Sequence, residues 1–124
     1  MGDVSENFNR SEFSCKCGCG LACISDHLIS FLQSVRTALG ESMVVTSGTR
    51  CSEWNAECGG SAGSSHVPDS NGLSYAVDIG CNNSIYRQKL LEAATPVFDR
   101  IGIAKTFIHF DVDPNKSSGV VWVY

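Results

Sequence analysis

Two short stretches of this 124-residue chain hold side chains that could bind a catalytic metal ion. The first runs from Ser64 through His66 to Asp78, and the second carries His109 and Asp111. Two imidazoles and a carboxylate from separate positions are the ligands that a catalytic Zn²⁺ uses when its fourth position stays open for water. Because two of the chain's three histidines lie here, the sequence predicts a zinc site formed by His66, Asp78 and His109.

The strand pattern around these residues supports the metal interpretation. Alternate side chains of an extended strand share a face. Along 107–112 this alternation puts His109 and Asp111 on a polar face, opposite an apolar one, and it also puts the small Ala76 beside Asp78. The alternative is that the first histidine lies in a polar loop, while His109 and Asp111 form a hydrogen-bonded pair on a strand surface.

The motifs Ser64-x-His66, Ala76-x-Asp78 and His109-x-Asp111 are similar to those of a known family. They resemble the SxHxxGxAxD and HxD signatures of the D-alanyl-D-alanine carboxypeptidase-like zinc peptidases, which act on bacterial cell-wall peptides and include many phage endolysins. The resemblance also includes segments outside these motifs: Phe8–Phe13 with Cys15–Gly20, Ser47–Cys51 with Asn55 and Gly59-Gly60, Ile101–Ile103, and the Trp122-x-Tyr124 ending. It therefore spans nearly the whole chain.

One segment departs from the family pattern. Asp78 lies twelve residues after His66, which is longer than SxHxxGxAxD provides, and Val67–Asn71 is the expected extra segment. Its Pro, Asp, Ser and Asn favour a surface loop, and loops accept insertions at little cost because closure entropy grows slowly with length. We therefore expect the metal ligands still to converge, while the shape of the cleft rim and the substrate preference do not follow from the resemblance.

The resemblance implies both an activity and a fold. It implies one zinc peptidase domain over 1–124, of the hedgehog/DD-peptidase type, that hydrolyses peptidoglycan stem peptides as a carboxypeptidase or an endopeptidase. It also implies that Arg50 and Ser64 hold the substrate peptide, with Arg50 stabilising the developing oxyanion. The alternative for Arg50 is a salt bridge to Glu53 or Glu57.

Asp111 has two possible roles beside the predicted metal. It could orient His109, or it could act as general base on the zinc-bound water, because Thr106 stands where some relatives have a Glu. We predict the general-base role. The absence of that Glu also keeps open a competing function, a non-catalytic zinc-containing module that binds cell wall or protein.

Composition and charge exclude several other classes. A chain that is 43% hydrophobic and 18% charged can form one globular domain with a substantial core. The net charge of −4 provides no basic patch for nucleic acid, and no apolar run approaches the ~20 residues that span a bilayer. We expect a monomer whose partner is the peptide substrate. Because residues 1–7 lack the pattern of a secretory signal, we expect synthesis in the cytoplasm, and the resemblance implies that the protein reaches the wall by a phage-type lysis route or cell rupture.

The predicted elements form a small α+β domain. Ser25 or Asp26 can cap a helix that Gly40 ends, and His27 on it is expected at the surface or in the cap rather than on a metal. The other predicted elements are a strand over 43–47, a helix from 84 to about 98 broken near Pro96, and strands over 101–103, 107–112 and 120–124. We expect an antiparallel sheet with helices on one side and the zinc site on its open face, and with Val44 and Ile79 on buried strand faces.

Seven cysteines require a separate interpretation. Cys15, Cys17, Cys19 and Cys23 lie within nine residues, and an odd total argues against a closed disulfide framework. The cluster could hold a second, structural Zn²⁺, but its spacing differs from the usual paired C-x₂-C arrangement, and reduced thiols in a Gly-rich turn are the interpretation we favour. A third possibility for the whole chain is a structural domain organised by these cysteines, without an active site.

Overall fold

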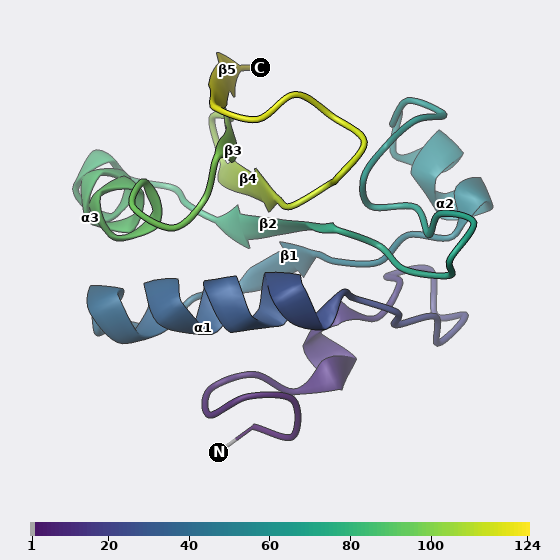
Figure 1. Ribbon diagram of the computed structural model, residues 1–124, viewed down its shortest axis with the longest axis horizontal. Helices are drawn as coiled ribbons and strands as arrows, with labels where there is room; N and C mark the ends of the chain where they lie inside the picture. The colour runs from purple at the N-terminus through teal and green to yellow at the C-terminus, as the bar shows by residue number, and fades with distance from the viewer. Residues whose placement is uncertain (1) are drawn as a thin grey trace.

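A five-stranded sheet forms the centre of the molecule in the computed structural model, which describes residues 2–124 (Figure 1). In sheet order the strands are β1 (Val45–Ser47), β2 (Ala76–Gly80), β4 (Phe107–Asp111), β3 (Arg100–Ile103) and β5 (Val120–Val123). The helices are the 3₁₀ helix η1 (Arg10–Phe13), α1 (Asp26–Leu39), α2 (Ser52–Glu57) and α3 (Ser84–Ala94). The predicted α+β class is confirmed.

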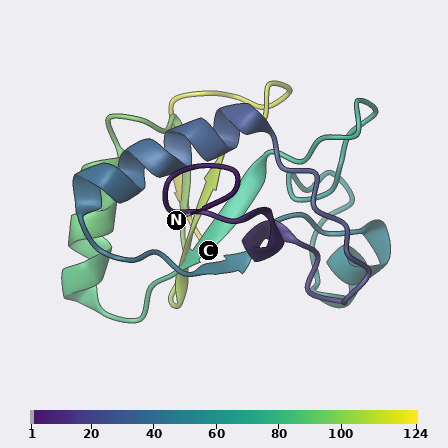
Figure 2. The ribbon, with the colours of Figure 1, turned by 90° about the horizontal axis from the view of Figure 1, so that it is seen from below.

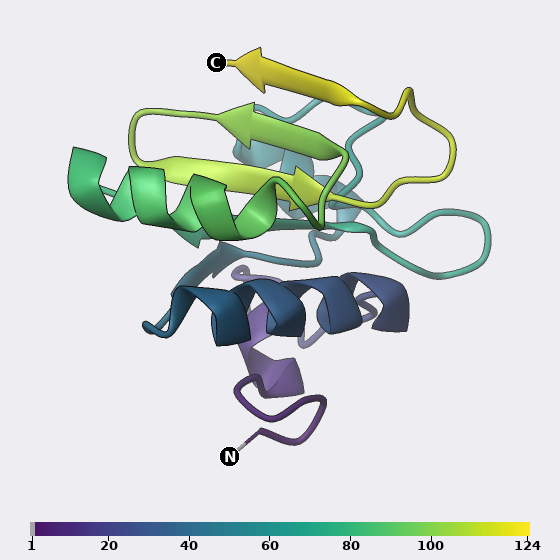
Figure 3. The same cartoon turned by 60° about the vertical axis from the view of Figure 1, so that its left-hand side comes forward.

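The two longer helices cover one face of the sheet. Figure 3 shows α1 and α3 in front of the strands and α2 behind them. Val77 and Ile79 of β2 and Ile108 and Phe110 of β4 are fully buried in the core that the sheet shares with these helices. Asp78 and His109, which alternate with them, therefore lie on the opposite face, as predicted. None of the helices in residues 2–124 has both the length and the apolar composition needed to cross a membrane.

The sheet is mixed, whereas the sequence suggested an antiparallel one. The pairs β1·β2, β2·β4 and β3·β4 are antiparallel, but β5 runs parallel to β3. In the β3·β4 hairpin the end of β4 lies beside the start of β3. The segment 112–119 leaves the end of β4 and brings the chain to the outer side of that start. A strand that begins there and follows the outer edge of β3 has to run in the same direction as β3.

The ends of α1 follow the predicted caps. The Ser25 side chain accepts a hydrogen bond from the Leu28 amide, and Gly40 adopts the left-handed conformation with φ 70° that ends many helices. The prediction for Val44 is wrong, because 64% of this residue is exposed. Its neighbours Met43 and Val45 point into the core instead, so the alternation of side chains turns Val44 outward.

The N-terminal segment links the helical layer to the site end of the sheet. Phe8 and Phe13 are buried in the core, and the loop that follows them runs past the start of α2 (Figure 2). Gly48, just after β1, allows this approach, because a Cβ there would lie 2.7 Å from the Phe13 Cα. The Thr49 amide also donates a hydrogen bond to the Phe13 carbonyl at 2.9 Å. The N-terminal segment thus packs directly against the loop that leads to Arg50.

Candidate metal centre

The three predicted metal ligands lie together on the face of the sheet opposite the core. Asp78 of β2 and His109 of β4 are directly paired across the two strands, and His66 reaches them from the loop before β2. Asp78 Oδ1 lies 2.9 Å from His109 Nδ1 and 3.2 Å from His66 Nε2. One donor atom from each residue lies within 4.8 Å of the other two, and all three residues are buried. This arrangement suits a metal ion with one side open to the cleft above it.

His66 is held with one ring nitrogen facing the other two ligands. Its Nδ1 donates a hydrogen bond to the Gly48 carbonyl at 2.7 Å, and its backbone carbonyl accepts one from the Arg50 amide at 2.9 Å. A ring that donates through Nδ1 keeps its proton there and leaves Nε2 as the free electron pair. His66 Nε2 is therefore prepared to coordinate a metal.

His109 is oriented by a carboxylate on its other side. Its Nε2 lies 2.7 Å from Asp111 Oδ2, while Arg100 Nε donates to Asp111 Oδ1 at 2.6 Å. Only 1% of Asp111 is exposed. A histidine that donates Nε2–H to a carboxylate presents Nδ1 to the metal, an arrangement common in zinc sites. The contacts of Asp111 are those of the orienting role, and the general-base role stays a prediction.

Electrostatics at the centre also suit a cation. Burial alone would raise the pKa of Asp78, but the hydrogen bond from His109 and the nearby imidazole of His66 outweigh it and hold that pKa well below its usual range. Burial alone would lower the pKa of His109, but hydrogen bonds to Asp111 and Asp78 raise it. The metal-free centre therefore favours a proton on His109 between two carboxylates. A metal ion would take the place of that positive charge.

Arg50 lies at the cleft beside Asp78. Its Nη2 is 3.4 Å from Asp78 Oδ2, and its Nε and Nη1 donate to Ser47 Oγ at 3.0 Å and to Asn55 Oδ1 at 3.2 Å. The alternative partners Glu53 and Glu57 make no contact with it among the hydrogen bonds and ion pairs of residues 2–124. Asn55 also donates to the Ser61 carbonyl, so α2 connects Arg50 to the loop before His66.

A cleft of about 500 Å³ opens over the three ligands. Its lining includes the predicted substrate residue Ser64, whose Oγ accepts the His66 amide, together with Arg50 and Lys116. Its lining also includes an aromatic wall, Phe107, Trp122 and Tyr124, in which the Tyr124 ring packs near both others. Trp122 lies close to His109, with ring centroids 5.4 Å apart.

The sequence interpretation gave no role to Arg100 or to Trp122. Trp122 can lie over the sheet here because Gly102 has no side chain, since a Cβ there would be 2.6 Å from the indole. The Arg100 guanidinium lies 5.0 Å from the centroid of the Trp122 ring, so one arginine contacts both Asp111 and the aromatic wall. The sequence held one signal for this contact. Arg100 directly precedes the 101–103 strand, which was expected to lie in the same sheet as the 107–112 strand.

The extra segment 67–71 belongs to a surface loop, as predicted. Asp69 organises it by accepting hydrogen bonds from the Asn71 and Leu73 amides and from the Tyr75 hydroxyl. The Tyr75 amide then donates to the Ser65 carbonyl at 2.9 Å, which returns the chain to the site. The inserted residues do not line the cleft over the metal ligands, and the ligands converge despite the longer spacing.

Comparison with known proteins identifies the family. A family model described as Peptidase M15 matches residues 6–111. The chain belongs to the peptidase M15 family. A search of curated proteins finds none that matches this chain. M15 enzymes are zinc-dependent peptidases, so the resemblance seen in the sequence is confirmed, and the buried His66, Asp78 and His109 are suited to the metal that the family requires.

Proposed function

We propose that this M15 peptidase hydrolyses peptide bonds in the stem peptides of bacterial peptidoglycan, as a carboxypeptidase or an endopeptidase. The observation that carries the proposal is the convergence of His66, Asp78 and His109 beneath a cleft that also presents Arg50. Stem peptides carry free carboxylates, and the cationic Arg50 and Lys116 at this cleft match that charge. The sequence resemblance to cell-wall peptidases supports the same substrate class.

His66 Nε2, Asp78 Oδ1 and His109 Nδ1 would hold the zinc ion. When bound, zinc supplies a water with a pKa lowered towards ~7 and a positive charge that polarises the scissile carbonyl. Asp111 fixes His109 in the tautomer that coordinates through Nδ1. Ser64 and Arg50 bind the peptide beside this centre, and the guanidinium donates hydrogen bonds to the oxygen on which negative charge develops.

The proton of the attacking water needs an acceptor. In the described part of the chain, Asp78 and Asp111 are the carboxylates that line the cleft, and Asp78 is assigned to the metal. Asp111 therefore stays the candidate for the general base, although His109 and Arg100 already occupy both of its oxygens.

The same contacts favour a second candidate function, a zinc-containing module that binds cell wall without hydrolysing it. Thr106 is exposed and stands where some relatives have a Glu, and neither lining carboxylate is free of partners. Such a module would keep the metal centre and the cleft while lacking an efficient proton acceptor.

Digestion of purified peptidoglycan separates the two functions. The zinc-loaded protein should release new peptide ends that mass spectrometry can identify, and His109→Ala should release none because it loses most of its metal. The identity of the released ends distinguishes cleavage at D-Ala-D-Ala, at L-Ala-D-Glu or at a cross-bridge. Binding to sedimented peptidoglycan without release of any fragment would contradict the hydrolase and support the binding module.

We further propose that hydrolysis serves wall degradation in a phage-type lysis route, which rests on the sequence resemblance to endolysins. Wild-type protein added to permeabilised bacteria should lower the turbidity of the suspension, and His109→Ala should not. Wall digestion in solution without any loss of turbidity would argue for a role in wall maintenance instead.

A further inference from the structure

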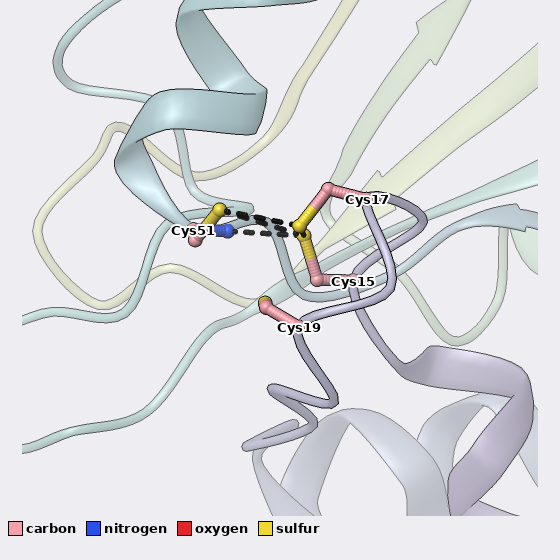
Figure 4. Close-up of side chains that lie close together, drawn as sticks. All are labelled: Cys15, Cys17, Cys19 and Cys51. Carbon is pink, nitrogen blue, oxygen red and sulfur yellow. Dashed lines mark hydrogen bonds between the residues drawn. The ribbon is translucent and has the colours of Figure 1, made fainter.

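Four cysteine sulfurs form a second cluster, separate from the His66, Asp78 and His109 centre. Cys15, Cys17 and Cys19 come from one turn after η1, and Cys51 caps the start of α2 (Figure 4). The sulfurs lie within 4.8 Å of one another. Cys23, which the sequence had grouped with the first three, is not part of this set, and Cys51 joins it from 36 residues away from Cys15.

The distances match those of a tetrahedral metal–thiolate site. A Zn–S bond of about 2.3 Å and tetrahedral angles put neighbouring sulfurs about 3.8 Å apart. The Cys15 sulfur lies 3.4 Å from that of Cys17 and 3.7 Å from that of Cys51, and the sulfurs of Cys17 and Cys51 are also 3.7 Å apart. Three thiols at nearly equal mutual distances fit one shared metal ion better than a disulfide, which would join only two of them.

The local backbone explains how such short spacings can converge. Gly18 and Gly20 have φ values of 90° and 83°, which few other residues adopt, and they turn the chain between and after the cysteines. The Cys15 amide donates to the Leu21 carbonyl at 2.7 Å and closes the turn. A spacing that would strain a regular strand or helix therefore brings Cys15, Cys17 and Cys19 to one point.

Backbone amides also point at the sulfurs. The Cys51 amide donates to Cys15 Sγ, and the Trp54 amide donates to Cys51 Sγ, both at 3.4 Å. Hydrogen bonds from N–H groups stabilise the negative charge of metal-bound thiolates and orient them. Cys17 and Cys19 are exposed, so an ion can reach the cluster from solvent.

We propose that Cys15, Cys17, Cys19 and Cys51 bind a structural Zn²⁺. All four ligand positions are filled by protein sulfur, which is the arrangement of a structural rather than a catalytic zinc. The ion ties the N-terminal segment to the first turn of α2, one residue after Arg50. It therefore fixes the backbone that presents Arg50 to Asp78, and it closes a loop that the folded chain must otherwise hold by weaker contacts.

Counting metal in the purified protein tests this proposal without any assumption about catalysis. Wild-type protein should bind two zinc ions per chain, measured by native mass spectrometry and atomic absorption. His109→Ala should retain one, and Cys17→Ser should also retain one. Cys23→Ser is the matched control, because its sulfur lies outside the four-sulfur set, and it should retain both ions.

Cobalt substitution identifies the ligands of each ion. The remaining ion in His109→Ala should give the intense near-ultraviolet absorption of thiolate bound to Co²⁺, and the remaining ion in Cys17→Ser should not. Hydrogen exchange at the amides of 50–54 should be faster in Cys17→Ser than in Cys23→Ser, because the clamp on α2 is lost. These measurements do not depend on peptidoglycan hydrolysis, so the proposal and the proposed function can fail separately.

Several results would overturn the zinc assignment. One is a single zinc ion in the wild-type protein that disappears in His109→Ala. Another is alkylation of the four thiols by iodoacetamide at the same rate before and after chelator treatment. Visible absorption from iron in the purified protein would place another metal on these sulfurs. If Cys17→Ser fails to fold, the wild-type zinc count and the alkylation rates still decide the question.

Discussion

Asp111→Asn tests how the candidate metal centre is organised. The substitution keeps the size of the side chain and an oxygen acceptor, but it removes the negative charge that faces His109 Nε2 at 2.7 Å and Arg100 Nε at 2.6 Å. Hydrogen bonds between charged partners are about twice as strong as neutral ones. The neutral amide of this variant would therefore hold both partners more weakly without opening a cavity.

These contacts set the expected losses in zinc affinity and in the free energy of unfolding. Loss of the partner behind a ligating histidine costs about 10- to 100-fold in metal affinity, or about 1.4–2.8 kcal/mol. Arg100 would also lose its anionic partner, with only 13% of its side chain exposed. Removing one member of a buried pair costs about 3–5 kcal/mol, but the amide oxygen still accepts. We therefore expect the free energy of unfolding of the metal-free protein to fall by about 1–3 kcal/mol.

Competition with a chromophoric chelator measures the zinc dissociation constant, and turnover on stem peptides is measured at saturating zinc. Asp111→Asn should raise the dissociation constant, because Asp111 orients His109, and turnover at saturating zinc should fall by ~10² or more, because Asp111 is also the proposed general base. Asp113→Asn is the matched control, because Asp113 contacts Ser65 and Lys116 rather than His109. A fall of less than about tenfold at saturating zinc would leave Asp111 with the orienting role alone and place the proton acceptor elsewhere. Unchanged zinc affinity in Asp111→Asn would refute the orienting role.

Three further predictions concern the cleft, the metal and the extra loop. Arg50→Lys should impair hydrolysis nearly as much as Arg50→Ala, because a point charge cannot reproduce three directed donors; wild-type kcat and KM in the lysine variant would contradict this. The pKa of His109 is raised by folding above its ordinary value near 6.5, so the protonated histidine stabilises the metal-free fold at pH values below 6.5. This contribution is lost as the pH rises through the raised pKa. The increase in melting temperature on adding zinc should therefore grow between about pH 5 and 8, and an increase that shrinks with pH would count against it. Tyr75→Phe removes the bond to Asp69 and should slightly lower the urea concentration at the midpoint of unfolding, with zinc content and turnover unchanged, as urea unfolding and zinc analysis can check.

Local patterns were sufficient to predict which face of the sheet carries His109, whereas the choice of all three metal ligands also needed the family resemblance. Alternation along 107–112 placed His109 opposite the buried Ile108 and Phe110, and the structure has that arrangement. The helix from Asp26 to Leu39 was readable because Ser25 and Gly40 carry specific backbone roles at its ends. In each case, the property depends on residues that are near one another in the sequence.

Other contacts depend on pairings that a single sequence does not give. The contact between Arg100 and Asp111 requires the β3·β4 register, in which Ile101 pairs with Phe110 and the two charged residues come next. The position of Cys51 beside Cys15 requires the path of the N-terminal segment past α2. The parallel pairing of β5 likewise depends on where 112–119 leaves the sheet. Long-range geometry, rather than residue type, determined these contacts.

Gly48 shows how residues far from the two ligand-bearing stretches help to position a metal ligand. Its carbonyl accepts the Nδ1 proton of His66, and its missing side chain lets the backbone of Phe13 approach. Phe13 is fully buried in the core, so the tautomer of a metal ligand is set by a contact that begins in the N-terminal segment. A change in that segment would move the Gly48 carbonyl and with it the Nε2 atom of His66, although neither residue would be altered. The position of the metal ligand is therefore a property of the whole fold.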